Sequence, residues 1–143
     1  MSDFPSIGHV AVTVKDLAVS RPWYQRLIGA EPVLDEPTQG GFHHTVFSIS
    51  GTLIGLHQHP DADTTAFSEL RTGLDHIAFG CVDRNTLETW RDHLDELDIA
   101  HGGIIDAHYG SGLSFRDPDG IALEFFAPPV LDGRSIADGG DAP

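Results

Sequence analysis

The sequence has little cysteine, little positive charge and no long apolar run. Its single cysteine, Cys81, excludes an internal disulfide, and with no signal peptide visible we expect a cytoplasmic protein. Eight Lys and Arg residues stand against 22 Asp and Glu, a net charge of −14 that argues against binding to nucleic acid or to an anionic membrane surface. No stretch approaches the roughly 18 apolar residues of a membrane span. The expected partner is therefore a small molecule.

The 143 residues suffice for one compact domain or for two small repeated halves. Hydrophobic residues make up 40% of the chain, which is ordinary for a globular protein, whereas nine histidines are an unusual count. From Ala127 onward the sequence is rich in Pro, Gly and Asp and has no periodicity. We therefore expect a disordered tail over residues 131–143.

An internal repeat organises the rest of the chain. The segment "IGHVAVTVKD" (7–16) aligns with "LDHIAFGCVD" (74–83), so that His9 matches His76 and Asp16 matches Asp83 at the same offset of 67 residues. In the first segment Val10, Val12 and Val14 alternate with smaller or polar residues, the pattern of a half-buried strand. His9 lies on the face opposite the valines.

Each copy of this strand is followed by a helix and three further strands. Ser20 before Arg21 and Pro22 predicts the start of the first helix, which ends at Gly29. Asn85, with Glu88 three residues on, predicts the start of the second. The later strands are expected at about 31–35, 42–49 and 52–59 in the first half and at about 103–106, 112–117 and 121–127 in the second. The two βαβββ modules span about 6–60 and 73–129 of one domain, 1–130.

The closing strands of the two modules also align. Gly51 matches Gly120 and Pro60 matches Pro129, both 69 residues apart. In this alignment Gly55 falls opposite Glu124, a carboxylate in the apolar strand "IALEFFA". Such a carboxylate costs free energy unless it is paired or binds a cation.

His9, His76 and Glu124 together suggest a metal site. Separately, each has a structural explanation: a hydrogen-bonded histidine, or a glutamate that faces water or pairs with an arginine. Two neutral imidazoles and one carboxylate, however, form a facial ligand set for a divalent first-row metal and leave coordination positions open for substrate.

These segments resemble the vicinal oxygen chelate superfamily, also called glyoxalase/bleomycin resistance/dioxygenase proteins. The resemblance covers about residues 6–129 and rests on "GHVAVTVKDL", "WYQRLIGAEP", "GLDHIAFGCVD" and "FRDPDGIALEFFAP". It implies an α+β fold in which the curved mixed sheets of two tandem βαβββ modules enclose a metal-containing cleft. It also implies His9, His76 and Glu124 as ligands of a divalent metal ion (Fe, Mn, Zn or Ni), and a homodimer.

The sequence departs from part of this family at the fourth ligand position. Glyoxalase I carries Glu or Gln where this chain has Gly55. Three protein ligands would then hold the metal, as in the extradiol dioxygenases and the metal-dependent fosfomycin-modifying transferases. His57 lies two residues along on the same face, so it is a candidate catalytic base, a candidate fourth ligand after a modest shift, or a solvent-facing histidine.

The functional hypothesis is a divalent-metal-dependent enzyme acting on a small oxygenated metabolite, of the glyoxalase or lyase, isomerase or dioxygenase type. Thiol transfer to fosfomycin would need a site made of cationic residues, and the chain has only 8 Lys and Arg residues. The alternative is a metal-independent protein that sequesters a drug, as bleomycin-resistance proteins do. A third alternative is a structural domain in which the three residues are vestigial.

Overall fold

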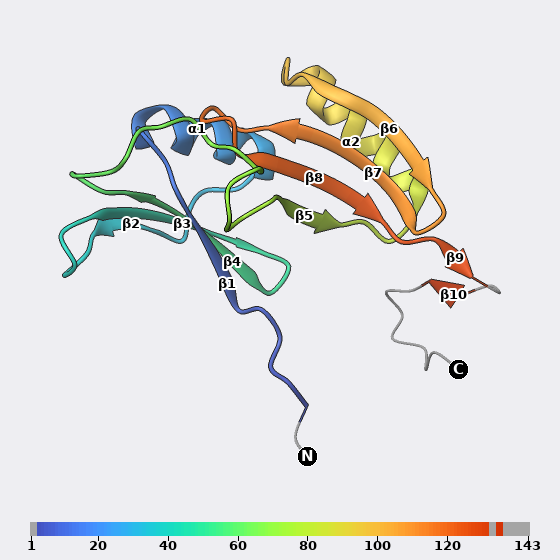
Figure 1. Ribbon diagram of the computed structural model, residues 1–143, viewed down its shortest axis with the longest axis horizontal. Helices are drawn as coiled ribbons and strands as arrows, with labels where there is room; N and C mark the ends of the chain where they lie inside the picture. Colours follow the sequence, from blue (N-terminus) through green and yellow to red (C-terminus); the bar gives the residue numbers. More distant parts are fainter. Residues whose placement is uncertain (1–2, 132–133, 136–143) are drawn as a thin grey trace. The chain divides into compact units, whose positions relative to one another are not determined.

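A computed structural model describes residues 3–131 and 134–135 of the chain. These residues form two compact units, Met1–Ala66 and Phe67–Pro143, which correspond to the two halves of the sequence repeat. In each unit a strand and a helix are followed by three strands that complete a four-stranded sheet (Figure 1).

The first unit contains a four-stranded mixed sheet and one helix. Its elements are β1 (His9–Thr13), α1 (Leu17–Ile28), β2 (Leu34–Pro37), β3 (His43–Ile49) and β4 (Thr52–Gln58). The strand order is β1-β4-β3-β2; β1 pairs with β4 in parallel, and the other pairs are antiparallel. The predicted βαβββ order is confirmed, and the first and last strands of the module are neighbours.

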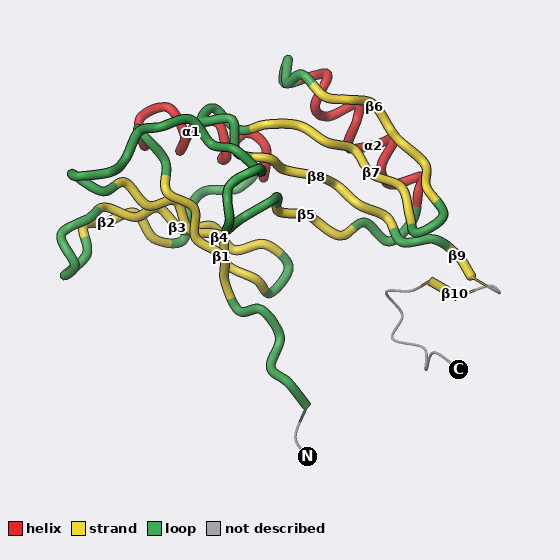
Figure 2. Tube along the Cα trace, viewed as in Figure 1, coloured by secondary structure: helices red, strands yellow, loops and turns green. Residues whose placement is uncertain are grey.

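The second unit repeats this topology. Its elements are β5 (Ile77–Gly80), α2 (Arg84–Glu96), β6 (His101–Ala107), β7 (Gly110–Arg116) and β8 (Ala122–Ala127). The order is β5-β8-β7-β6, again with one parallel pair, between β5 and β8 (Figure 2). The α+β class and the mixed sheets are therefore as predicted.

Alternation along the strands gives each sheet one face against its helix and one open face. In the second unit Leu113, Phe115, Leu123 and Phe125 are buried with Leu87 and Leu94 of α2, and Trp90 of α2 stacks on Phe125 at 4.5 Å between ring centroids. Figure 1 shows α2 lying against this sheet. Residues of opposite parity, including Glu124, lie on the open face.

Both helices begin earlier than the sequence pattern predicted. The N-caps are Asp16, whose side chain accepts a hydrogen bond from the Ala18 N–H, and Asp83, which accepts one from the Thr86 N–H. Ser20 instead lies inside α1 and is buried, and Asn85 lies inside α2. An aspartate carboxylate caps a helix as well as serine or asparagine does, and the repeat already aligned the two aspartates.

After β8, the chain forms a short antiparallel pair, β9 (Val130–Leu131) with β10 (Arg134–Ser135). The other residues of the predicted disordered tail, 132–133 and 136–143, lie outside the described residues. Within residues 3–131 and 134–135, none of the helices combines the length and the apolar character needed to cross a membrane.

Candidate metal centre

The strand registers place Gly55 and Glu124 at corresponding positions in the two modules. Ala11 of β1 pairs with Gly55 of β4, and Ala78 of β5 pairs with Glu124 of β8. Because Ala11 and Ala78 are themselves matched by the repeat, the alignment of Gly55 with Glu124 is confirmed. The first module therefore has no side chain where the second has a carboxylate.

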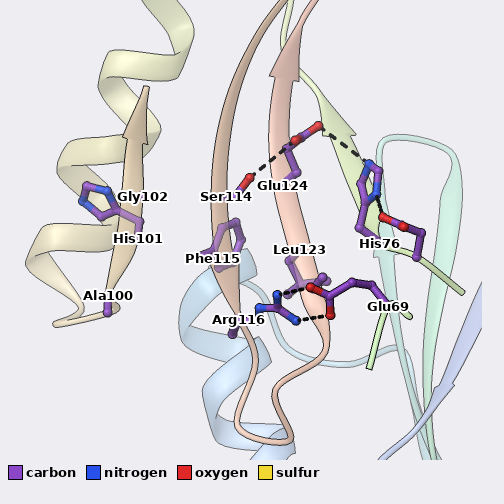
Figure 3. Close-up of a pocket in the computed structure, with 12 residues that line it drawn as sticks. Glu69, His76, Ala100, His101, Gly102, Ser114, Phe115, Arg116, Leu123 and Glu124 are labelled. Atoms are coloured by element: carbon purple, nitrogen blue, oxygen red, sulfur yellow. Dashed lines mark hydrogen bonds and ion pairs between the residues drawn. The ribbon is translucent and has the colours of Figure 1, made fainter. Parts of the chain in front are cut away.

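His76 and Glu124 face one another on the open side of the second sheet. Nε2 of His76, the residue directly before β5, lies 3.9 Å from Oε1 of Glu124 (Figure 3). The other ring nitrogen, Nδ1, lies 2.6 Å from Oδ1 of Asp75. When Nδ1 donates its proton to Asp75, the lone pair of Nε2 points toward Glu124, as a metal-binding histidine requires. Asp75 was not identified in the sequence, although it immediately precedes His76.

The Glu124 carboxylate lies next to two small residues, Ser114 and Gly112. The Ser114 hydroxyl donates a long hydrogen bond of 3.5 Å to Oε2. The side chain leans over Gly112, where a Cβ would lie 3.1 Å from Oε2. A side chain at position 112 would therefore press on the carboxylate.

His9 is the first residue of β1 in the first unit, on the face opposite the buried Val12. Within either described unit, no three His, Cys, Asp or Glu side chains converge closely enough to hold a metal ion. The structure thus brings His76 and Glu124 together, and the three-residue set remains a prediction that draws on both modules.

His57 of β4 occupies the space that Gly55 leaves on the open face of the first sheet. Its Nε2 lies 3.2 Å from the position that a Cβ at residue 55 would take. The ring stacks on Phe42, with centroids 4.7 Å apart, and Phe42 also contacts His59 at 4.6 Å. His57 is thus fixed by packing, and no β-bulge is needed to bring its ring to position 55.

The surroundings of His57 favour its neutral form. Burial lowers the pKa of this histidine below its ordinary value of 6.5, and the neighbouring His44, His59 and His9 lower it further. His44 is its cross-strand partner, with ring centroids 5.8 Å apart. A neutral imidazole is able to accept a proton or to bind a metal.

A cavity of about 580 Å³ adjoins the His76–Glu124 pair in the second unit. Its lining includes Asp75, His76, Ser114, Glu124, Arg116 and Glu69 (Figure 3). Arg116 donates two hydrogen bonds to Glu69, and these, above all, lower the pKa of the Glu69 carboxyl to about 2. Sequence reasoning missed this pair because its members are 47 residues apart with no shared pattern.

Residues 6–125 match the family model described as Glyoxalase/Bleomycin resistance protein/Dioxygenase superfamily. The chain belongs to this superfamily. Among curated members it is 28% identical over 131 residues to the metallothiol transferase FosB of Staphylococcus haemolyticus, covering 90% of this chain and 88% of that protein. It is 23% identical over 123 residues to the putative ring-cleaving dioxygenase MhqA of Bacillus subtilis, covering 85% of this chain but 39% of that longer protein.

Solved structures of the superfamily have the same fold. A glyoxylase/bleomycin resistance protein/dioxygenase domain from Frankia sp. EAN1pec is 29% identical, with a TM-score of 0.77 over 92% of this chain and 96% of that one. The fosfomycin resistance protein FosX of Listeria monocytogenes, in a mutant form complexed with Mn(II), is 16% identical with a TM-score of 0.64 over 96% of this chain and 98% of that one. This second likeness concerns the fold alone. The superfamily relatives named here include metal-dependent enzymes.

Proposed function

We propose that this superfamily member is a divalent-metal-dependent enzyme acting on a small oxygenated substrate, with His9, His76 and Glu124 as the metal ligands. The observation that carries the proposal is the His76–Glu124 pair, whose histidine is oriented by Asp75 through the opposite ring nitrogen. His9 completes the set as the counterpart of His76 in the repeat.

The donor atoms fit a first-row divalent ion. His76 Nε2 and Glu124 Oε1 could hold one such ion together only if these two atoms lay within about 3 to 4 Å of one another. The separation of 3.9 Å is at the wide end of that range. Imidazole and carboxylate donors suit Fe, Mn, Zn and Ni, and the FosX structure contains Mn(II).

When bound, the metal would act as a Lewis acid that polarises oxygens of the substrate. The chain would supply proton transfer through His57, whose lowered pKa keeps the ring neutral near pH 7 and whose packing on Phe42 fixes its orientation. A base of this kind suits a lyase or isomerase reaction. Ring cleavage would suit the same three-ligand set if the native metal is iron.

Anaerobic purification followed by elemental analysis tests the proposal. We expect about one divalent metal ion per chain in the wild-type protein, and a large loss of metal after the triple substitution of His9, His76 and Glu124 to Ala. Iron would favour oxygen chemistry, whereas nickel or zinc would favour isomerisation. A wild-type protein that holds no metal and takes up none in titration would overturn the proposal and favour metal-independent drug sequestration.

Thiol transfer is a second candidate, favoured by the similarity to the metallothiol transferase FosB along nearly the whole chain. The test is the Mn(II)-loaded protein with fosfomycin and a low-molecular-weight thiol such as cysteine, with free thiol measured over time. Metal-dependent consumption of the thiol that requires Glu124 would select this reaction. No consumption, by a protein that binds metal, would leave the lyase, isomerase or dioxygenase classes.

The proposal includes the homodimer that the family resemblance implies and the cytoplasmic location expected from the single cysteine and the lack of a visible signal peptide. Light scattering of the purified protein checks the first, and fractionation of the producing cells checks the second. Neither is needed for the metal measurement, so their outcomes are independent of it.

A further inference from the structure

Arg116 lies on the wall of the cavity beside the candidate metal ligands. It is the last residue of β7 and pairs with Ala122 of β8, two residues before Glu124 on the same strand. Two residues of strand span about 7 Å, and residues two apart share a face of the sheet. Arg116 and Glu124 therefore both reach the open face, and Ala122, the cross-strand partner of Arg116, lies about 7 Å from Glu124 along β8.

The guanidinium already holds a carboxylate. Nη2 of Arg116 lies 2.9 Å from Oε1 of Glu69, and Nη1 lies 3.1 Å from Oε2 (Figure 3). Nη1 also donates a hydrogen bond of 3.0 Å to the Gly120 carbonyl oxygen. The Gly120 carbonyl anchors the guanidinium through one N–H group, and the two N–H groups that point at Glu69 form a bidentate site for a carboxylate or a phosphonate.

The two partners differ in how firmly the chain holds them. Arg116 belongs to a central strand of the sheet, whereas Glu69 belongs to the segment between β4 and β5 that has neither helix nor strand. Their side chains are 49% and 39% exposed, so the pair contributes little net stability and exchanges at small cost. An incoming anion can therefore replace Glu69 without disturbing the sheet.

The charges around the cavity give a reason for this arrangement. Among the described residues that line it, Arg116 is the one arginine or lysine, while Glu69, Asp75 and Glu124 are carboxylates. With Glu69 in place the lining is net negative and repels anions. When Glu69 swings away and a divalent ion is bound, the charges of the lining and the ion sum to a positive value.

We propose that Arg116 is the binding site for an anionic group of the substrate, a carboxylate or a phosphonate, and that Glu69 occupies it when no ligand is bound. The proposal rests on the proposed function only in placing that anion next to the metal. It assigns the substrate to the class of small oxygenated acids, with the acid group bound on the same face of the sheet as the proposed ligand Glu124.

Binding of two probe anions, acetate and methylphosphonate, tests the proposal at low ionic strength. The readout is the NMR signal of the Arg116 Nε–H group together with the dissociation constant. Glu69→Gln frees the guanidinium, so we expect up to about fivefold tighter binding, the range set by exposed ion pairs. Arg116→Gln removes charge-assisted hydrogen bonds and is expected to weaken binding at least about tenfold. Whichever anion binds more tightly identifies the acid group.

The chain offers a matched control in Arg84 and Asp106. Nε and Nη2 of Arg84 lie 2.7 and 3.1 Å from the two Asp106 oxygens, an equivalent ion pair that does not line the cavity. Asp106→Asn removes the same charge as Glu69→Gln, and we expect it to leave anion binding unchanged. Equal gains in both variants, no gain in Glu69→Gln, or unchanged binding in Arg116→Gln would each overturn the proposal.

Metal content separates this proposal from the proposed function. Circular dichroism first verifies that each variant is folded, and elemental analysis then gives its metal content. A protein without metal whose Glu69→Gln variant still gains anion affinity would retain the anion site and refute the metal enzyme. A protein that binds metal but whose Glu69→Gln variant gains no anion affinity would refute the anion site and leave the metal enzyme standing.

Discussion

The open faces of the two sheets carry different chemistry on the same backbone. In the first module the face presents imidazole and phenyl rings, with His57, His44 and Phe42 in mutual contact. In the second it presents Glu124 and Arg116 beside a cavity. The repeat therefore supplies the same backbone twice, while the side chains place charged groups on one copy and a cluster of histidine and phenyl rings on the other.

In each module a glycine lies next to these side chains. Gly55 gives room to the His57 ring, and Gly112 gives room to the Glu124 carboxylate. In each module, the absence of a side chain at the glycine leaves room for a candidate functional side chain from a neighbouring position. The modules differ in which group enters the space.

The largest expected effect follows from removing the negative charge of Glu124 in the second module. Glu124→Gln should weaken binding of Mn(II) at least about 100-fold, because the substitution removes the only anionic ligand of the proposed set. Calorimetric titration measures this change. Glu88→Gln, on α2, removes the same charge away from the cavity and should have no effect. Equal affinities in Glu124→Gln and the wild type would exclude Glu124 as a ligand.

A smaller loss of metal affinity is expected from Asp75→Asn. The amide no longer fixes the proton on Nδ1 of His76, so Mn(II) affinity should fall about 10- to 100-fold in the same titration. The control is Asp95→Asn, which alters a second Asp–His pair in this module, Asp95 with His101 at 2.7 Å. If both variants lose affinity equally, the effect reflects general charge and not the orientation of His76.

Adding one methyl group in each module compares the modules directly. In Gly112→Ala the new Cβ meets the Glu124 carboxylate at 3.1 Å, and we expect a several-fold loss of Mn(II) affinity because the ligand must shift. In Gly55→Ala the Cβ meets the His57 ring at 3.2 Å, so the NMR signals of His57 should move while metal affinity is retained. Gly80→Ala, where a Cβ meets nothing within 4 Å, is the control. Equal losses in all three would show that neither glycine has a specific role.

The smallest expected effect concerns pH and the histidine cluster. Because the folded state lowers the pKa of His57 below 6.5, the unfolded chain binds more protons as the pH falls below that value, and the folded state loses stability. His57→Asn removes this contribution. Its melting temperature should therefore fall less than that of the wild type between pH 6.5 and about 5, by on the order of 1 °C after allowance for solvent exposure. Identical curves for His57→Asn and the wild type would contradict the lowered pKa of His57.

The strand alternation and the internal repeat predicted the order of the helices and strands and the register of the strands. Strand alternation and the repeat placed Gly55 opposite Glu124 because register is set by the period of two along each strand. The predicted start of the first helix was wrong. Ser20 before Pro22 has the pattern of an N-cap, but the side chain that accepts the capping hydrogen bond, from the Ala18 N–H, belongs to Asp16.

Contacts between distant segments could not be predicted in this way. Glu69, which lies in a segment without periodicity, binds Arg116. Phe42, the residue just before β3, stacks on His57. Each depends on which rotamer fills a space that the folded sheet creates. No spacing rule in a single sequence records such a choice.

The parallel pairing of β5 with β8 has a consequence for synthesis. His76 leaves the ribosome 48 residues before Glu124, and β5 has β8 as its one neighbour in the described sheet. An unfinished chain that ends before β8 therefore presents His76 without its carboxylate partner and without the strand that positions it. The two proposed ligands of the second module can therefore come together only after the chain has been synthesised through β8.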